Sequence, residues 1–227
     1  MKIPLIINTH RDPLTDDPLL PHLHWAEKCG SFSEIHPIVG EETGESKRVL
    51  WQNSDRQIRE WWREHRDEVS GEVVALCEWD TLFLTQAPPM RDGVDMLFGF
   101  VRHFGKKMIS RTRPTGRIRE YDPTEDVRKN KRFQSLLAII DNEALRAVDG
   151  PVLGLSFGFF MTRRWVLDSL LDKKWDSLFS VNMQNELRTP TIAAVEGAKI
   201  RMTSTPKVRA AVKDPLEIDT PEIYHPI

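Results

Sequence analysis

The sequence predicts an α/β fold: a single domain whose mixed, mostly parallel sheet is flanked by helices. Apolar segments of strand length alternate along the 227 residues with segments whose apolar residues recur at helical spacing. The run from Val73 to Cys77 is short and continuously apolar, which is typical of a strand buried on both faces. Neither an internal repeat nor a linker divides the chain into independent units. We therefore expect one core built around residues 73–77.

Three strands and two helices are predicted in the first half of the chain. The strands cover residues 3–8, 34–39 and 73–77, and the helices cover residues 19–29 and 55–69. Ser54 is a suitable N-cap for the second helix, and Gly71 follows its end. Trp61 and Trp62 fall on the apolar face of that helix, so we expect them in the core rather than in a platform for a ligand.

The second half is less regular. We expect strands at 94–101 and 199–202, a glycine-punctuated strand or strand pair at 150–161, helices at 133–147, 163–172 and 185–196, and an extended tail at 214–227. Thr162 is a candidate N-cap for the helix that follows it, and Pro190 is tolerated if it lies in the first turn of its helix. Residues 105–131 are highly charged and lack a clear period, which predicts a long, partly mobile basic loop.

Composition excludes several classes of protein. The formal net charge of -2 gives no overall attraction to nucleic acid or to an anionic membrane, and the basic loop lacks interleaved aromatic residues apart from Tyr121. No apolar run is long enough to cross a bilayer, and the N-terminus lacks a signal-peptide pattern. The two cysteines, Cys29 and Cys77, indicate neither a zinc cluster nor a disulfide framework. A cytoplasmic protein is the expectation.

Two carboxylates follow the predicted central strand. Glu78 and Asp80 are one residue apart, so in an extended chain they share a face at the carboxyl end of the strand, where open α/β sheets bind ligands. Two such oxygen ligands suit a hard divalent cation that also holds a diphosphate. An acid-x-acid triplet is nevertheless common, and on the triplet alone two solvated acids at a strand end are the commoner explanation.

The order of features resembles the nucleotide-diphospho-sugar glycosyltransferases of the GT-A fold. Residues 78–83 (Glu-Trp-Asp-Thr-Leu-Phe) look like the acid-x-acid motif of that superfamily, with Glu in place of the first Asp. Residues 154–164 are similar to the segment that borders the acceptor site, and residues 185–191 resemble the acid-bearing helix start near the acceptor. Residues 224–226 match the position of a late metal-binding histidine. The resemblance implies a nucleotide-binding half (1–102), a mobile basic loop (103–132) and an acceptor-side half (133–227).

The resemblance implies a metal site for Mn²⁺ or Mg²⁺. Asp80 would be the direct ligand, Glu78 would bind the metal through water or hold the donor ribose, and His225 would complete the shell. A neutral imidazole suits Mn²⁺ better than Mg²⁺. The alternative for His225 is a solvated histidine in the tail.

The resemblance also implies contacts to a UDP- or GDP-sugar donor. The candidates lie after the first strand, before the second helix and in the acid motif: Thr9, Arg11, Asn53, Asp55, Glu78, Trp79 and Asp80. The alternative for Asn53 and Asp55 is simple capping of the helix that follows them. The commoner explanation for Arg11 is an arginine on the surface without a ligand.

Glu186 is the candidate general base that would take the proton of the acceptor hydroxyl. A carboxylate favoured at a helix start by the macrodipole is the alternative.

The function that follows is a metal-dependent, hexosyltransferase-like glycosyltransferase that moves a sugar from a nucleotide sugar to a hydroxyl acceptor. The first alternative is a nucleotidyltransferase of related sheet plan. That class usually has a glycine-rich, basic loop just after its first strand, and residues 9–13 contain no glycine. The second alternative is a non-catalytic nucleotide-sugar-binding protein.

Overall fold

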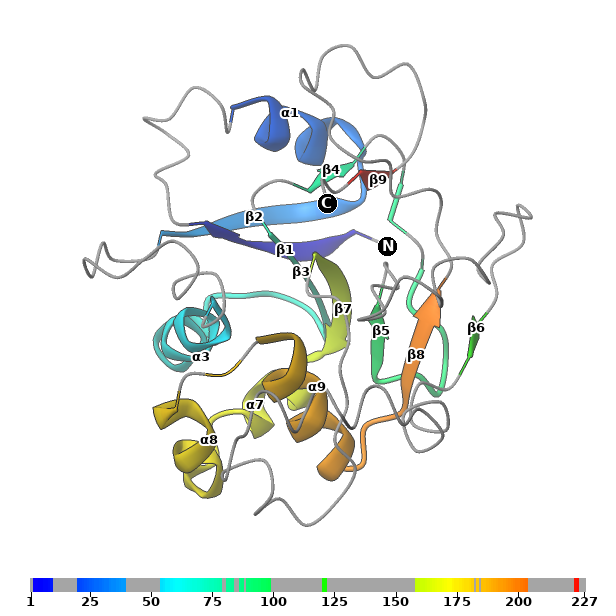
Figure 1. Ribbon diagram of the computed structural model, residues 1–227. Helices are drawn as coiled ribbons and strands as arrows, with labels where there is room; N and C mark the ends of the chain where they lie inside the picture. Colours follow the sequence, from blue (N-terminus) through cyan, green and yellow to red (C-terminus); the bar gives the residue numbers. More distant parts are fainter. Residues whose placement is uncertain are drawn as a thin grey trace, which may run out of the picture.

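A computed structural model gives the fold of the protein (Figure 1). It describes residues 2–9, 20–39, 54–78, 81–83, 86–87, 89–98, 120–121, 158–181, 183, 185–203 and 223–224. A seven-stranded sheet has the order β2-β1-β3-β7-β5-β8-β6. Its strands are β1 (Ile3–Thr9), β2 (Phe32–Val39), β3 (Val73–Glu78), β5 (Met96–Phe98), β6 (Glu120–Tyr121), β7 (Phe159–Arg163) and β8 (Ile200–Thr203). A separate ladder joins β4 (Leu82–Phe83) to β9 (Ile223–Tyr224).

The sheet is mixed and mostly parallel, as the sequence predicts. β1 is parallel to β2 and β3, and β5 is parallel to β8. β7 is antiparallel to both β3 and β5, and β6 is antiparallel to β8. Five strands (β1, β2, β3, β5 and β8) therefore run one way, and β6 and β7 run the other way. Because β7 lies between β3 and β5, strands from both halves of the chain interleave in one sheet.

β3 is the central, buried strand that its apolar sequence predicts. It lies between β1 and β7, and every residue from Val74 to Glu78 is buried. Side chains alternate between the two faces of a strand, and each face of β3 packs into a different core. Val74 and Leu76 belong to one apolar cluster, and Ala75 and Cys77 belong to the other. A fully buried leucine of this kind contributes about 1.5–3 kcal/mol to stability.

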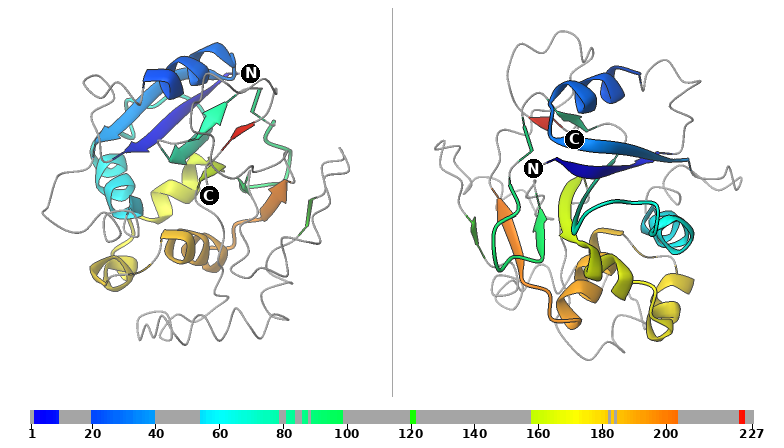
Figure 2. Two further views of the ribbon diagram at one scale, coloured as in Figure 1. Left: turned by 45° about the horizontal axis from the view of Figure 1, so that its top comes forward. Right: turned by 180° about the vertical axis from the view of Figure 1, so that it is seen from behind.

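Helices cover both faces of the sheet. α1 (Leu20–Lys28) lies on one face, and the other face carries α3 (Ser54–His65), α7 (Arg164–Ser169), α8 (Asp176–Ser180) and α9 (Asn185–Val195) (Figures 1 and 2). A short 3₁₀ helix, η3 (Lys173–Trp175), leads into α8. Side chains of β1 alternate between these two faces. Leu5 and Ile7 face α1, and Ile6 faces α3.

The two tryptophans of α3 take different positions. Trp62 is 1% exposed and donates from Nε1 to Asp168 Oδ1 over 2.9 Å, so the prediction of a core residue is confirmed for it. Trp61 is half-buried and stacks on His65, with ring centroids 4.8 Å apart. Its other neighbour is His36 of β2, at 5.4 Å between centroids.

Several predicted boundaries differ from the structure. Thr162 does not cap a helix, because β7 continues through it to Arg163 and α7 begins only at Arg164. Part of the predicted basic loop, Glu120–Tyr121, forms β6 on β8. Pro190 is the sixth residue of α9, past its first turn. The predicted helix at 133–147 lies outside the described residues.

Within the described parts of the chain, no helix has the length and apolar character needed to cross a membrane.

Candidate functional site

Four elements with polar ends converge where the parallel strands finish. Asn8 and Glu78 are partners in the ladder of β1 and β3, one residue or less from the carboxyl end of each strand. Asn8 Nδ2 donates to the carbonyl of Ser54, the first residue of α3, over 3.3 Å. Asn185, the first residue of α9, donates from Nδ2 to Ser54 Oγ over 2.5 Å. The N-termini of two helices therefore meet at the carboxyl edge of the sheet, where the macrodipole of each favours negative charge.

A hydrogen-bonded turn spans the acid-x-acid triplet. The amide of Thr81 donates to the carbonyl of Glu78 over 3.1 Å, which closes a four-residue turn from Glu78 to Thr81. Both ends of the turn hydrogen-bond to the carbonyl of Gly158. This carbonyl accepts from the Glu78 amide at 3.1 Å and from Thr81 Oγ1 at 2.7 Å. Trp79 and Asp80 lie outside the described residues, but their place in the chain is between these fixed ends.

The tail of the chain returns to the same turn. In the β4–β9 ladder, Leu82 pairs with Tyr224 and Phe83 pairs with Ile223 in antiparallel register. His225 lies outside the described residues, but it directly follows Tyr224. Because the strands are antiparallel, the chain beyond Tyr224 starts at the end of the ladder next to Thr81. The role of Asp80 and His225 as metal ligands stays a prediction, because neither residue is among those that the structure describes.

Asp55 lies at the junction of α3 and α9 and is fully buried. Its Oδ1 pairs with Arg188, and its Oδ2 accepts from Thr189 Oγ1 over 3.1 Å. Arg188 is also buried and donates to the carbonyls of Leu178 at 2.9 Å and Val181 at 2.8 Å. Burial raises the pKa of the Asp55 carboxyl, and the Arg188 guanidinium opposes that rise. Both oxygens of Asp55 therefore join the two helices, and its contact with a nucleotide stays a prediction.

The remaining predicted residues are placed only in part. Thr9 is the last residue of β1, at the same edge, and Glu186 is the second residue of α9, directly after the buried Asn185. The side chains of both lie outside the described residues. So do Arg11 and Asn53, although Asn53 directly precedes Ser54. Among the described residues, no group of three or more His, Cys, Asp or Glu side chains could hold a metal ion.

Sequence reasoning missed three residues of this edge: Asn8, Thr81 and Arg188. Asn8 is 6% exposed, and its Oδ1 has no hydrogen-bond partner among the described residues. The signal that could have found it is a polar residue directly after the apolar run of β1. Arg188 carried a weaker signal, as a charge within a mostly uncharged helix. Nothing in the sequence marked the hydroxyl of Thr81, because its partner is a backbone carbonyl 77 residues away.

Comparisons with known proteins find several similar solved structures, two of which follow. No family model matches the chain, and no curated protein matches it. The crystal structure of A197 from STIV is 12% identical, with a TM-score of 0.41, and the match covers 89% of this chain and 81% of that one. A glycosyltransferase involved in the glycosylation of the major capsid of PBCV-1 is 6% identical, with a TM-score of 0.37, and the match covers 78% of this chain and 69% of that one. Scores and identities this low carry no argument about function.

Proposed function

We propose that the protein is a metal-dependent glycosyltransferase that transfers a sugar from a nucleotide-diphosphate sugar to a hydroxyl acceptor. The observation that carries the proposal is the convergence at the carboxyl edge. The acid-bearing turn after β3, the tail strand β9 that leads to His225, and the N-terminus of α9 with Glu186 all lie there. Open α/β sheets bind their ligands at this edge.

The residues of the turn and the tail fit a divalent cation by their chemistry. Asp80 would supply a carboxylate ligand, His225 an imidazole, and Glu78 a further carboxylate acting through water or on the donor ribose. Mn²⁺ accepts this mixture of oxygen and nitrogen donors, and Mg²⁺ accepts the carboxylates. When bound, the metal would neutralise charge that develops on the diphosphate as it leaves.

The donor would lie along the ends of β1 and β3. Thr9 is the last residue of β1, Arg11 follows that strand in the sequence, and Asn53 precedes the N-terminus of α3, whose partial positive charge favours a phosphate. The ligand proposed for this edge is UDP or GDP carrying a sugar.

In the proposed transfer, Glu186 accepts the proton of the acceptor hydroxyl. A bond forms between the acceptor oxygen and the anomeric carbon of the sugar. The bond from that carbon to the phosphate oxygen breaks, and its electron pair leaves with the nucleoside diphosphate. The start of α9 is a suitable support for this base, since Asn185 is anchored on Ser54 and Arg188 is buried one turn further along.

Titration calorimetry with UDP and GDP, each with Mn²⁺ and with EDTA, tests the proposal. We expect tighter binding with Mn²⁺, and we expect Asp80→Asn to remove that gain, because the metal bridge needs the carboxylate charge. Asp92→Asn, at an exposed carboxylate in the 91–93 turn, is the control and should keep the gain. Equal affinities with Mn²⁺ and with EDTA in the wild type would refute the metal-dependent site.

A turnover screen separates the alternatives. Incubation with nucleotide sugars and Mn²⁺ should release a nucleoside diphosphate when a hydroxyl acceptor is present. Binding without turnover over a broad acceptor set would favour a non-catalytic sugar-nucleotide binder. Release of pyrophosphate from a nucleoside triphosphate and a sugar phosphate would favour a nucleotidyltransferase.

A further inference from the structure

The buried end of β1 carries a hydrogen-bond acceptor that lacks a donor. Asn8 is 6% exposed, and its Nδ2 donates to the carbonyl of Ser54 over 3.3 Å. This bond fixes the side-chain amide, because Oδ1 and Nδ2 cannot exchange places without losing it. Oδ1 itself has no partner among the described residues. A buried acceptor without a donor costs free energy, so the position is suited to a donor that a ligand supplies.

Glu78 lies beside Asn8 on the same face of the sheet. The two residues are partners in the parallel β1–β3 ladder, where neighbouring strands are about 4.8 Å apart. Ile6 and Leu76, two residues earlier in each strand, both pack into the apolar cluster on the α3 side. Residues two apart in a strand share a face, so Asn8 and Glu78 also face that side. Glu78 is buried as well, and its carboxylate adds a second acceptor beside that of Asn8.

The charge of this edge restricts the kind of ligand group that fits. α3 begins at Ser54 and α9 begins at Asn185, and the bond from Asn185 Nδ2 to Ser54 Oγ joins the two helix starts. The partial positive charges of these helix starts disfavour a cation directly beside Asn8, and the two acceptors disfavour direct contact with an anion. A neutral hydrogen-bond donor is the group that satisfies both conditions.

A hydroxyl fits better than an N–H group. Ser54 Oγ accepts from Asn185, and its own proton has no acceptor among the described residues. An N–H group could only donate to Asn8, whereas a hydroxyl can donate to Asn8 Oδ1 and accept from Ser54 Oγ. A vicinal diol would use Glu78 too, with one hydroxyl on each of the two neighbouring side chains.

We infer that Asn8 is a specificity-determining residue that binds a ribose hydroxyl of the nucleotide, with Glu78 on the neighbouring hydroxyl of the same diol. The inference rests on the proposed function, because it takes the nucleotide as the ligand, but it does not depend on a metal ion. The transferred sugar also carries vicinal hydroxyls. The ribose is common to all donors of the proposed class, and UDP and GDP contain no other alcohol, so these two probes test the ribose alone.

The first measurement uses the wild-type protein. Titration calorimetry compares UDP and GDP with their 2′-deoxy and 3′-deoxy forms in one buffer, so the metal condition is the same for all. At least one deoxy form should bind about 10-fold or more weakly, because its complex lacks the donor for Asn8 Oδ1. Equal affinities for the parent nucleotide and both deoxy forms overturn the inference alone. No binding of UDP or GDP, with Mn²⁺ or with EDTA, overturns the proposed function as well, so the two failures can be told apart.

The second measurement assigns the discrimination to Asn8. Leucine branches at the same carbon as asparagine and has no acceptor. We expect Asn8→Leu to bind UDP or GDP about 10-fold less tightly, to lose the discrimination against the deoxy form, and to unfold at no lower urea concentration than the wild type. Thr162→Val removes a buried hydroxyl at the opposite edge of the sheet, so this control should keep the affinity and the discrimination.

Wild-type discrimination in Asn8→Leu would overturn the role of Asn8 and would leave Oδ1 to an enclosed water molecule. A large loss of stability in Asn8→Leu with the discrimination intact would overturn it too, because it would make the side chain a purely structural one. The comparison of nucleotides in the wild type needs no variant, so it decides the inference even where Asn8→Leu does not fold.

Discussion

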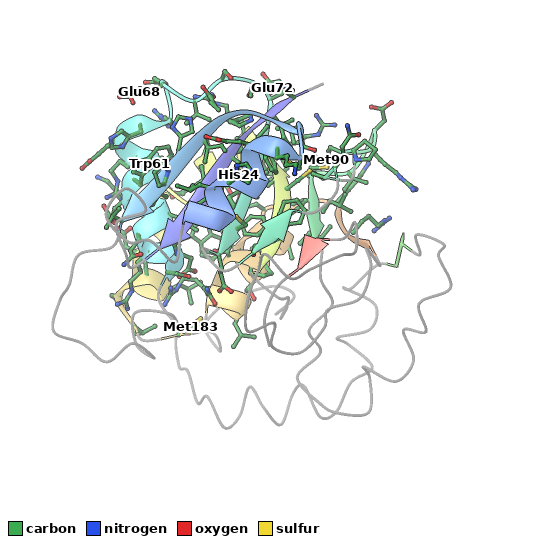
Figure 3. All side chains as sticks on the ribbon, turned by 90° about the horizontal axis from the view of Figure 1, so that it is seen from above. His24, Trp61, Glu68, Glu72, Met90 and Met183 are labelled. Atoms are coloured by element: carbon green, nitrogen blue, oxygen red, sulfur yellow. The ribbon has the colours of Figure 1, made fainter. Side chains whose placement is uncertain are left out.

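The two edges of the sheet use polar side chains in opposite ways. At the amino edge of the parallel strands, Asp95 is tied into the structure: its Oδ2 accepts from the Lys199 amide at 2.9 Å, and its Oδ1 lies 3.6 Å from Arg163 Nε. At the carboxyl edge, Asn8 leaves a buried Oδ1 without a partner among the described residues. Figure 3 labels Glu72, which precedes β3, and Met183, which precedes α9, near these opposite edges.

The difference separates structural polar groups from those that are available for a ligand. Asp95 joins the start of β5 to both of its neighbours. Its carboxylate binds the Lys199 amide before β8, and its carbonyl accepts from the Arg163 amide of β7 at 2.8 Å. A carboxylate used in this way has little left to offer a substrate. The carboxyl edge instead combines a turn, two helix N-termini and an orphan acceptor. The comparison predicts that variants at the two edges will affect different measurements.

The largest effect on stability is expected from Arg188→Met. This change leaves the Asp55 carboxylate buried and without its cation, and breaking a buried pair costs about 3–5 kcal/mol. Urea denaturation measures the loss. The double variant Asp55→Asn with Arg188→Met should be less destabilised than Arg188→Met alone, since no unpaired charge remains. If the single variant lost less than about 1 kcal/mol, the pair would not be what joins α3 and α9.

Glu186→Gln should lower turnover about 10²–10⁴-fold with little change in donor affinity, because a general base acts in the transition state. The measurement is kcat and KM for an active donor and acceptor pair. Glu60→Gln, at an exposed carboxylate of α3, is the control and should keep full activity. Full activity in Glu186→Gln would show that Glu186 is a carboxylate that favours the helix start and is not the general base.

Asp95→Ala should lower stability by about 0.5–1.5 kcal/mol, because the Lys199 amide loses a hydrogen-bond acceptor that water only partly replaces. Its nucleotide affinity in Mn²⁺ should equal that of the wild type. Thermal unfolding and calorimetry on the same variant make the two measurements. A loss of nucleotide affinity in this variant would break the division between the two edges.

The sequence predicted the core elements well and the turns poorly, for physical reasons. The continuous apolar runs of β1 and β3 follow directly from burial on two faces, and α3 follows from its apolar stripe. β4, β6 and β9 have two residues each, too few to show a period. The Thr81–Gly158 bond and the Asp55–Arg188 pair depend on tertiary contacts between distant residues, which local patterns do not encode.

The smallest expected effect lies near the amino end of β2. The Glu34 carboxylate accepts from the amide of Ser70 at 2.8 Å and from its hydroxyl at 2.9 Å. The backbone bond from Ser70 is the main cause that lowers the pKa of Glu34 below its usual 4.5, with burial opposing it and His36 adding to it. A lowered acid pKa means that the folded state favours the charged form. The stabilisation is therefore present above about pH 4.5 and is lost as the pH falls through the folded pKa.

Glu34→Gln should flatten this acid limb of the stability curve. The side chain is 31% exposed, so the difference from wild type should be a few tenths of a kcal/mol at neutral pH and should vanish in acid. Urea unfolding at about pH 7 and about pH 3 gives the comparison, with Glu27→Gln, at an exposed carboxylate of α1, as the control. Because Glu34 is remote from the carboxyl edge, Mn²⁺-dependent nucleotide affinity should be the same in this variant as in the wild type. A change in that affinity would show that the site extends across β2, beyond the edge where β1 and β3 end.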